Sequence, residues 1–232
     1  MSAALSVRLE GVTKHYRAGG AAVRAIDGVD LEVESGSNLA IMGPSGCGKS
    51  TLLGLLGGLE RPSRGRIWLD GVEISSLSET ERSRVRRESI GFVFQSYDLL
   101  PFLTAKENVE FQIALVGRGD GSDRSGELIA RLDLNDHATK LPDQLSGGQR
   151  QRVGIARALA HGPRLILGDE PTGELDSETA KTVLDLMLKA QAAIGATMIV
   201  VTHDAAVAAR MDRVVSLRDG KVVGDRRMDE EA

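Results

Sequence analysis

The stretch Gly43-Pro44-Ser45-Gly46-Cys47-Gly48-Lys49-Ser50 decides how the rest of this chain is interpreted. It matches the pattern G-x-x-x-x-G-K-[ST], in which glycines let the backbone wrap so tightly that several N–H groups point at phosphate oxygens. The apolar run Asn38–Met42 precedes it and the apolar segment Ser50–Leu59 follows it, which predicts a strand, a loop and a helix in that order. A merely flexible glycine loop is the alternative, and this context weighs against it.

The residue types in this loop suit the binding of a nucleotide phosphate. Lys49 would place a positive charge on the β- and γ-phosphates, and the Ser50 hydroxyl would ligate Mg²⁺. The helix that follows offers its positive end to the anion. We interpret Cys47 as a small filler rather than a redox centre. The residues expected to contact the nucleotide here are Gly43, Ser45, Gly46, Cys47, Gly48, Lys49, Ser50 and Thr51.

Composition limits the classes of protein that remain. The 232 residues suit one compact domain, or one with an inserted subdomain. With 29 Lys and Arg against 33 Asp and Glu, the net charge is −4, so no nucleic-acid partner is expected. The single cysteine excludes an internal disulfide and a four-cysteine zinc site. No apolar stretch approaches the roughly 20 residues that cross a membrane, and no signal peptide is evident, so we expect a cytoplasmic protein.

Short apolar and alternating runs predict strands early in the chain, and the last third alternates strands with helices. The predicted strands are Ser6–Leu9, Val29–Val33, Asn38–Met42, Arg66–Leu69, Ile90–Phe94, Leu165–Leu167, Thr197–Thr202, Arg213–Leu217 and Lys221–Val223. The predicted helices are Ser50–Leu59, Thr104–Val116, Glu127–Leu132, Gly147–His161 and Ser177–Ala193, with a polar loop over Gly117–Gly126. This order predicts an α/β fold with a mainly parallel sheet, which binds ligands at the carboxyl ends of its strands.

Two adjacent carboxylates end one of these strands, in the segment Leu165-Ile166-Leu167-Gly168-Asp169-Glu170. Beside a phosphate-binding loop, Asp169 is placed to hold Mg²⁺ through its water shell. Glu170 is then placed to orient the attacking water or to accept its proton. Adjacent carboxylates also close strands that have no catalytic role, so the combination with the loop carries the interpretation.

The segment Leu145-Ser146-Gly147-Gly148-Gln149 opens a predicted helix and has two readings. Ser146 and Gln149 have the spacing of a capping box, which would only satisfy free N–H groups of the helix. A capping box needs no glycine pair, and each glycine costs a helix about 1 kcal/mol. Glycines at a helix start are reasonable where a phosphate approaches the bare backbone.

The phosphate-binding loop, this LSGGQ segment and the Asp169-Glu170 pair, in this order, resemble the ATPase subunit of ATP-binding cassette (ABC) transporters over essentially the whole chain. The resemblance implies a P-loop NTPase (RecA-like) core over 1–95 and 163–232, with an N-terminal antiparallel β subdomain and a helical subdomain over about 96–162. It also implies that two subunits sandwich two ATP molecules, with Mg²⁺, head to tail. The residues expected to contact the partner's ATP are Ser146, Gly147, Gly148, Gln149 and Asp176.

Further elements of the family can be matched one by one. Gln95, after a predicted strand, resembles the glutamine that contacts Mg²⁺ and senses the membrane partner, although a polar residue there can be ordinary. His203 resembles the switch histidine that contacts the γ-phosphate. Tyr16 resembles the aromatic that stacks on adenine, with a plain surface tyrosine as the alternative. The expected catalytic residues are Lys49, Glu170 and His203, and the expected metal ligands are Ser50, Gln95 and, through water, Asp169.

One family segment departs from the common pattern. Gly173-Glu174-Leu175-Asp176 replaces the usual Ser-Ala-Leu-Asp of the D-loop but keeps Leu175 and Asp176, so cross-dimer communication is expected while Gly173 and Glu174 have no assigned role. Thr172-Gly173 and the run from Phe92 to Pro101 are similar to the branch of macrolide-efflux (MacB), lipoprotein-releasing (LolD) and cell-division (FtsE) ATPases.

The resemblance implies an ATPase that drives a separate transmembrane permease, of the export or mechanotransmission type, from the inner face of the cell membrane. We expect contact with the permease through Ser96–Leu103, where apolar side chains would be costly to expose. The alternatives are an importer ATPase subunit, a soluble ABC-type ATPase that acts on nucleic acid or ribosomes, and a small-molecule P-loop kinase. The kinase gives no reason for the LSGGQ segment, and the cargo is left open.

Overall fold

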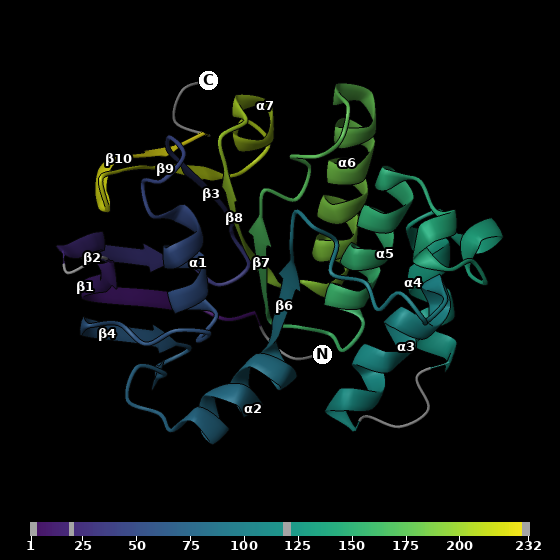
Figure 1. Ribbon diagram of the computed structural model, residues 1–232, viewed down its shortest axis with the longest axis horizontal. Helices are drawn as coiled ribbons and strands as arrows, with labels where there is room; N and C mark the ends of the chain where they lie inside the picture. The colour runs from purple at the N-terminus through teal and green to yellow at the C-terminus, as the bar shows by residue number, and fades with distance from the viewer. Residues whose placement is uncertain (1–3, 19–20, 118–121, 229–232) are drawn as a thin grey trace.

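A six-stranded sheet forms the centre of the computed structural model, which describes residues 4–18, 21–117 and 122–228 (Figure 1). Its strand order is β10-β9-β3-β8-β7-β6, and only the pairing of β9 with β10 is antiparallel. The strands are β3 (Asn38–Met42), β6 (Ile90–Val93), β7 (Leu165–Asp169), β8 (Thr197–Thr202), β9 (Arg213–Arg218) and β10 (Lys221–Arg227). The predicted mainly parallel sheet is confirmed, and the carboxyl ends of its parallel strands share one edge.

A second, antiparallel sheet carries the N-terminal part of the chain, in the order β2-β1-β4-β5. Its strands are β1 (Val7–Ala18), β2 (Ala21–Val33), β4 (Arg64–Leu69) and β5 (Val72–Glu73). The sequence predicted only the short pieces Ser6–Leu9 and Val29–Val33 of the two long strands. The pairing of β1 with β2 shifts register three times between Leu9 and His15, and such irregularities interrupt the alternation on which the prediction relied.

Helix α1 (Lys49–Leu56) lies between the two sheets (Figure 1). Four of its leucines are buried in a core that also takes side chains from both sheets, and these are Leu52, Leu53, Leu55 and Leu56. The helix ends at Leu56 rather than at the predicted Leu59, because Gly57 caps it and Gly58 adopts a φ of 63°. This packing fixes the loop between β3 and α1 at the edge where the parallel strands end.

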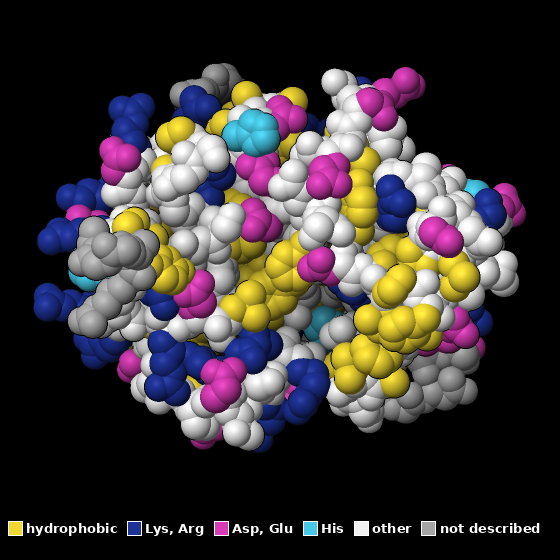
Figure 2. All heavy atoms as spheres, in the orientation of Figure 1, with side chains coloured by type: hydrophobic (Ala, Val, Ile, Leu, Met, Phe, Trp, Pro, Cys, Tyr) yellow, Lys and Arg dark blue, Asp and Glu magenta, His cyan; other side chains and the backbone are white. Residues whose placement is uncertain are grey.

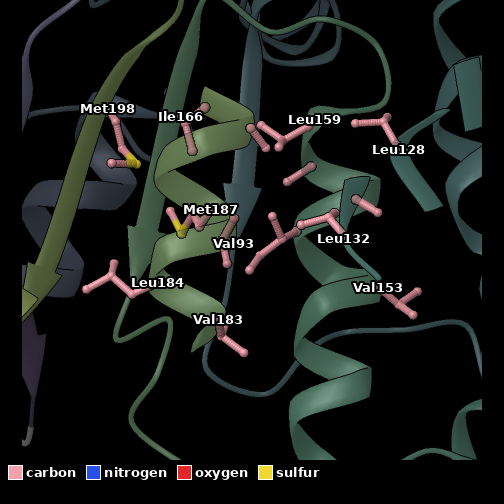
Figure 3. Packing of buried hydrophobic residues seen from close by; sticks show 14 of the residues in the cluster. Val93, Leu128, Leu132, Val153, Leu159, Ile166, Val183, Leu184, Met187 and Met198 are labelled. Atoms are coloured by element: carbon pink, nitrogen blue, oxygen red, sulfur yellow. The ribbon is translucent and has the colours of Figure 1, made fainter. Parts of the chain in front are cut away.

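Helices α5 (Gly147–Leu159) and α6 (Ser177–Ile194) cover the other face of the central sheet. Helices α3 (Ala105–Val116) and α4 (Ser122–Arg131) pack on α5, and short 3-10 turns lie at Asn135–His137 and Pro142–Gln144. Figure 3 shows Val93 of β6 and Ile166 of β7 directed toward α6, with Met187 and Leu184 of α6 among them. One apolar core therefore joins the sheet to the helical part.

The predictions differ from the structure at three helices besides α1. The predicted loop Gly117–Gly126 is wrong in its second half, since α4 begins at Ser122. Helix α2 (Glu79–Ser89) was not predicted at all, because it has no apolar face and buries only Arg82. Its start carries a signal that could have revealed it, a capping box formed by Ser78 and Glu81. A four-residue helix, α7 (Ala205–Ala208), follows β8.

Candidate functional site

The edge where the parallel strands end holds a pocket of about 870 Å³. Ten of the residues expected to act on the nucleotide line it: Ser45, Gly46, Gly48, Lys49, Ser50, Thr51, Gln95, Asp169, Glu170 and His203. They come from the loop after β3 and the first residues of α1, from the ends of β6 and β7, and from the residue after β8. The parallel order β3-β8-β7-β6 brings them together, as the sequence predicted.

The loop before α1 is shaped by glycine. Gly48 caps the helix with a φ of 105° and without a side-chain hydrogen bond, so the first N–H groups of α1 stay available to an anion. A Cβ at Gly48 would lie 2.2 Å from the carbonyl oxygen of Ala25, so no other residue fits there. Nζ of Lys49 donates to the carbonyl oxygens of Gly43 (2.8 Å) and Pro44 (3.1 Å) and is itself buried.

Two expected members of this loop do not line the pocket. Gly43 lies beside it and accepts the hydrogen bond from Lys49. Cys47 is buried in the apolar core under the loop, 5% exposed, with its Sγ against Gly43. That packing agrees with the interpretation of Cys47 as a filler.

Ser50 and Asp169 face each other across the pocket. The Ser50 hydroxyl donates to Oδ1 of Asp169 over 3.2 Å. Burial raises the pKa of the Asp169 carboxyl above its usual range, the neighbouring charge of Glu170 raises it further, and the bond from Ser50 opposes the shift. A hydroxyl beside a half-buried carboxylate is a suitable pair of oxygen ligands for a hard cation or for its water shell.

Glu170 is held by groups at the end of β8. Its φ of 45° lies in the left-handed region, which is uncommon for a residue other than glycine. Oε1 lies 2.8 Å from Nδ1 of His203, and Oε2 accepts from the Thr202 hydroxyl at 3.2 Å. Gln95 also reaches this side of the pocket, with its Nε2 close to Gly173.

Tyr16 lies outside the set of pocket-lining residues. Its hydroxyl donates to the Glu60 carboxylate, 2.6 Å and 2.7 Å from the two oxygens, and also interacts with Thr51, which does line the pocket. Nζ of Lys14 lies over the Tyr16 ring, 5.1 Å from its centroid, so one face of the ring is already in a cation–π contact. Burial and then the bond to Glu60 raise the pKa of the Tyr16 phenol above its usual value.

The segment expected to act in trans does not line the pocket of its own subunit. Ser146 caps α5 through a complete capping box with Gln149. The capping-box interpretation of the Ser146–Gln149 spacing is therefore confirmed. A Cβ at Gly148 would lie 2.5 Å from Cγ2 of Thr179, so the close packing of α5 against α6 also favours glycine at this position. Asp176 caps α6, accepting from the N–H groups of Glu178 and Thr179.

Sequence reasoning missed six residues that line the pocket: Val23, Arg24, Ala25, Phe94, Ser96 and Glu174. The first three belong to β2, in the other sheet, and nothing in their local pattern marks them. It also missed Gln151, whose Nε2 donates to the carbonyl oxygen of Pro171 over 2.5 Å while the residue is 1% exposed. A polar residue within the apolar face of a predicted helix was the available signal.

Comparison with known proteins gives relatives over almost the whole chain. The chain is 48% identical over 229 residues to the macrolide export ATP-binding/permease protein MacB of Rhodopseudomonas palustris (strain HaA2), covering 98% of this chain and 35% of that protein. It is 45% identical over 228 residues to the probable syringafactin export ATP-binding/permease protein SyfD of Pseudomonas syringae pv. syringae, covering 97% and 35%. The chain thus spans about a third of the length of these curated relatives.

Solved structures agree with the sequence relatives. The ATP-binding cassette MJ0796, in a dimeric post-hydrolysis state bound to ADP and Pi, superposes with a TM-score of 0.89 at 41% identity, covering 96% of this chain and 98% of that one. A second dimeric structure of MJ0796, a bacterial ABC transporter cassette, gives 0.88 at the same identity. The sequence model of the family described as ABC transporter matches residues 26–173. The chain therefore belongs to the ABC transporter family, as an ATPase cassette that binds ATP.

Proposed function

We propose that this cassette hydrolyses ATP as a head-to-tail dimer and thereby drives a membrane permease of the export or mechanotransmission type. The observation that carries the proposal is the separation of two sets of residues. The phosphate loop, Glu170 and His203 share one pocket, whereas the segment from Ser146 to Gln149 lies outside it. A site split in this way is completed by a second copy of the chain.

The pocket suits a triphosphate. Lys49 exchanges its two carbonyl partners for phosphate oxygens, and the uncapped start of α1 adds backbone N–H donors. Tyr16, held by Glu60, offers the remaining face of its ring to adenine. The two interactions act at opposite ends of the nucleotide.

Mg²⁺ fits the donor set of this pocket. Ser50 and Gln95 would hold it directly and Asp169 through water, and the hydrogen bond between Ser50 and Asp169 already joins two of these three. Mg²⁺ usually keeps several waters and binds through a few protein groups together with phosphate oxygens, so a small set of oxygen ligands is sufficient. When bound, Mg²⁺ neutralises the charge that develops on the phosphates.

Hydrolysis is assigned to groups with fixed positions. Glu170 orients the attacking water and accepts its proton, because its carboxylate faces the pocket while Thr202 and His203 hold it. His203 and Lys49 stabilise charge on the γ-phosphate, together with Ser146 of the other subunit. Asp176 and Leu175, in the segment that follows Glu170, carry the communication between the two sites.

The permease partner is proposed from the relatives and from the surface. Those relatives are named export ATP-binding/permease proteins, and this chain matches about a third of each. Within the described residues, no helix is long and apolar enough to cross a membrane. From the names of these relatives we propose a peripheral position on the inner face of the cell membrane, with the permease supplied by another polypeptide segment. The word "export" in the names of the relatives favours the export type over an importer.

The surface offers a place for that partner. Phe102 is 72% exposed, and Phe111 and Leu115 of α3 are 43% and 49% exposed. Figure 2 shows hydrophobic side chains gathered over this helical part of the molecule. Only part of the expected contact segment Ser96–Leu103 can meet a partner through apolar side chains. Leu99 packs on the core and Tyr97 is half-buried. The exposed apolar residues of the segment are Pro101 and Phe102.

The proposal is tested with the membrane subunit that co-purifies with the chain. ATPase activity should require Mg²⁺ and should change when the detergent-solubilised subunit is added. Phe102→Glu should weaken co-purification by about tenfold or more while leaving the ATPase of the isolated cassette unchanged. Val72→Glu, at an equally apolar position 52% exposed on the other sheet, is the matched control. Retention of the partner by the Phe102 variant would contradict the proposed surface.

A further inference from the structure

Tyr97 joins three segments of the same subunit near the phosphate pocket. Its hydroxyl interacts with the Glu174 carboxylate and with the Arg150 guanidinium, which also lies over its ring, 5.3 Å from the centroid. A Cβ at Gly147 would lie 3.2 Å from the Tyr97 hydroxyl oxygen. Tyr97 lies two residues after Gln95. It therefore contacts both the first turn of α5 and the segment that follows Glu170.

The backbone at this point is held in an uncommon conformation. Tyr97 and Asp98 have φ values of 64° and 48°, two consecutive left-handed residues without a glycine. Arg157 of α5 donates to the carbonyl oxygens of both residues, and the Ser96 hydroxyl donates to the Asp98 carboxylate over 2.9 Å. Such conformations persist only where the surroundings hold them, and here α5 does so.

Glu174 poses an electrostatic problem for a phosphate site. It lines the same pocket as Asp169 and Glu170, so three carboxylates face the place where a triphosphate is proposed to bind. An additional unpartnered negative charge there would repel the nucleotide. In the structure the Glu174 carboxylate interacts with the hydroxyl of Tyr97, and the Arg150 guanidinium lies over the ring of the same tyrosine.

A phenol hydroxyl is a hydrogen-bond donor that suits a neighbouring carboxylate. Burial, followed by the charge of Glu174, raises the pKa of Tyr97 above its usual value, and Arg150 opposes the shift. A hydrogen bond to a charged acceptor is stronger than one between neutral groups.

We propose that Tyr97 is a positioning residue for ATP binding and hydrolysis. Its hydroxyl partners the Glu174 carboxylate, so that this charge is not directed at the phosphates, and its ring, in contact with Arg150, fixes the first turn of α5 relative to Gln95. The inference rests on the proposed function and deepens it. It assigns a role to Glu174, one of the two residues at which this segment departs from the common family pattern.

The test compares four full-length proteins: wild type, Tyr97→Phe, Glu174→Ala and the double variant. A fluorescent ATP analogue reports binding, and phosphate release reports KM and kcat. Tyr97→Phe keeps the ring and the Arg150 contact but releases Glu174, so its Kd and KM should rise about threefold to tenfold. Glu174→Ala should bind ATP at least as tightly as wild type. The double variant should match Glu174→Ala, because without the carboxylate the hydroxyl has no charge to partner.

Two outcomes overturn the inference. One is an unchanged Kd and KM in Tyr97→Phe, and the other is a double variant that stays as weak as Tyr97→Phe, which would mean that the hydroxyl acts through packing alone. Glu178→Ala is the matched control, since it removes an exposed carboxylate from the same region that does not line the pocket. In its background, Tyr97→Phe should weaken ATP binding as much as it does in the wild-type chain. If wild type fails to hydrolyse ATP, the proposed function fails instead, and the binding data still decide the role of Tyr97.

Discussion

Nδ1 of His203 lies 2.8 Å from Oε1 of Glu170, and this contact joins the ends of two neighbouring parallel strands. The backbone N–H of His203 and the Thr202 hydroxyl donate to the other carboxylate oxygen, Oε2, over 3.4 Å and 3.2 Å. Both oxygens of Glu170 are thus engaged by one short segment. A carboxylate held in this way can keep a water in a fixed attack position, because its own ordering is already complete before the nucleotide binds.

Glu170→Gln is expected to separate binding from chemistry. The amide keeps the size of the side chain and can still accept from Thr202, but it cannot take a proton. The value of kcat should therefore fall by roughly 10²–10⁴, while the Kd for ATP changes little. Because ATP then stays bound, a dimer should accumulate in the presence of ATP, visible by size-exclusion chromatography. Hydrolysis near the wild-type rate would show that Glu170 is not the base.

Asp169→Asn is expected to stabilise the nucleotide-free protein near pH 7. Burial raises the pKa of Asp169 in the folded state, so folding is penalised at any pH where this carboxyl is charged. The amide removes that penalty. Below pH of about 4 the carboxyl is protonated in the unfolded chain as well, and the difference between the two proteins should vanish. Thermal unfolding without Mg²⁺ and ATP, measured between pH 4 and 8 by circular dichroism, checks the trend.

The same substitution should lower the Mg²⁺-dependent ATPase, since it removes the charge that we propose holds the ion's water shell. The Asp136→Asn variant, on the surface of the helical part, is a suitable control for the stability measurement. A nucleotide-free Asp169→Asn protein that is less stable than wild type at pH 7 would mean that the hydrogen bond from Ser50 outweighs burial.

Much of the site could be predicted because its members end consecutive parallel strands. β3 and β8 have the predicted bounds, Asn38–Met42 and Thr197–Thr202, since each is a continuous apolar run that ends at a polar residue or a glycine. Once strands of this kind lie side by side, residues that follow them must converge. The contact between Glu170 and His203 was not predictable in the same way, because it requires β7 and β8 to be neighbours.

The parts that were missed depend on contacts distant in sequence. Arg24 reaches the pocket because β2 belongs to a sheet that packs over α1, and no local pattern carries that information. The partner of Glu174 is Tyr97, 77 positions earlier, so neither residue marks the other. Helix α2 was missed for a different reason, because a helix without an apolar face leaves no periodic signal.

Alanine substitutions at two glycines of the phosphate loop should distinguish the free-energy cost of backbone strain from that of a steric clash. Gly46 has a φ of 79°, and none of the described residues places a neighbouring heavy atom within 4 Å of the position that a Cβ would take, so Gly46→Ala should cost about 1–2 kcal/mol of folding free energy. Gly48 has a φ of 105° and would place a Cβ 2.2 Å from the carbonyl oxygen of Ala25, so Gly48→Ala should cost distinctly more. Denaturant unfolding of both variants measures the difference. Equal costs would show that the backbone of β2 can shift at Ala25 to make room for the added methyl group.

Ser146 and Thr104 provide a matched pair for deciding what the LSGGQ serine does. Each caps a helix through a complete capping box, Ser146 with Gln149 and Thr104 with Glu107. If capping were the whole role of Ser146, both alanine variants would lose about 1 kcal/mol of stability and neither would lose activity. Because we propose that Ser146 contacts the partner's γ-phosphate, Ser146→Ala should also lower kcat by roughly tenfold or more.

The measurement is thermal unfolding together with ATPase assays on both variants at saturating ATP. Ser146→Ala should keep the wild-type Kd for ATP in the monomer, since the phosphate loop that binds the nucleotide first is untouched. Its loss should appear in kcat and in the ATP-dependent dimer. An equal small loss of stability with full activity in both variants would reduce Ser146 to a helix cap, and the LSGGQ glycines would then be explained by the close packing of Gly148 against Thr179 alone.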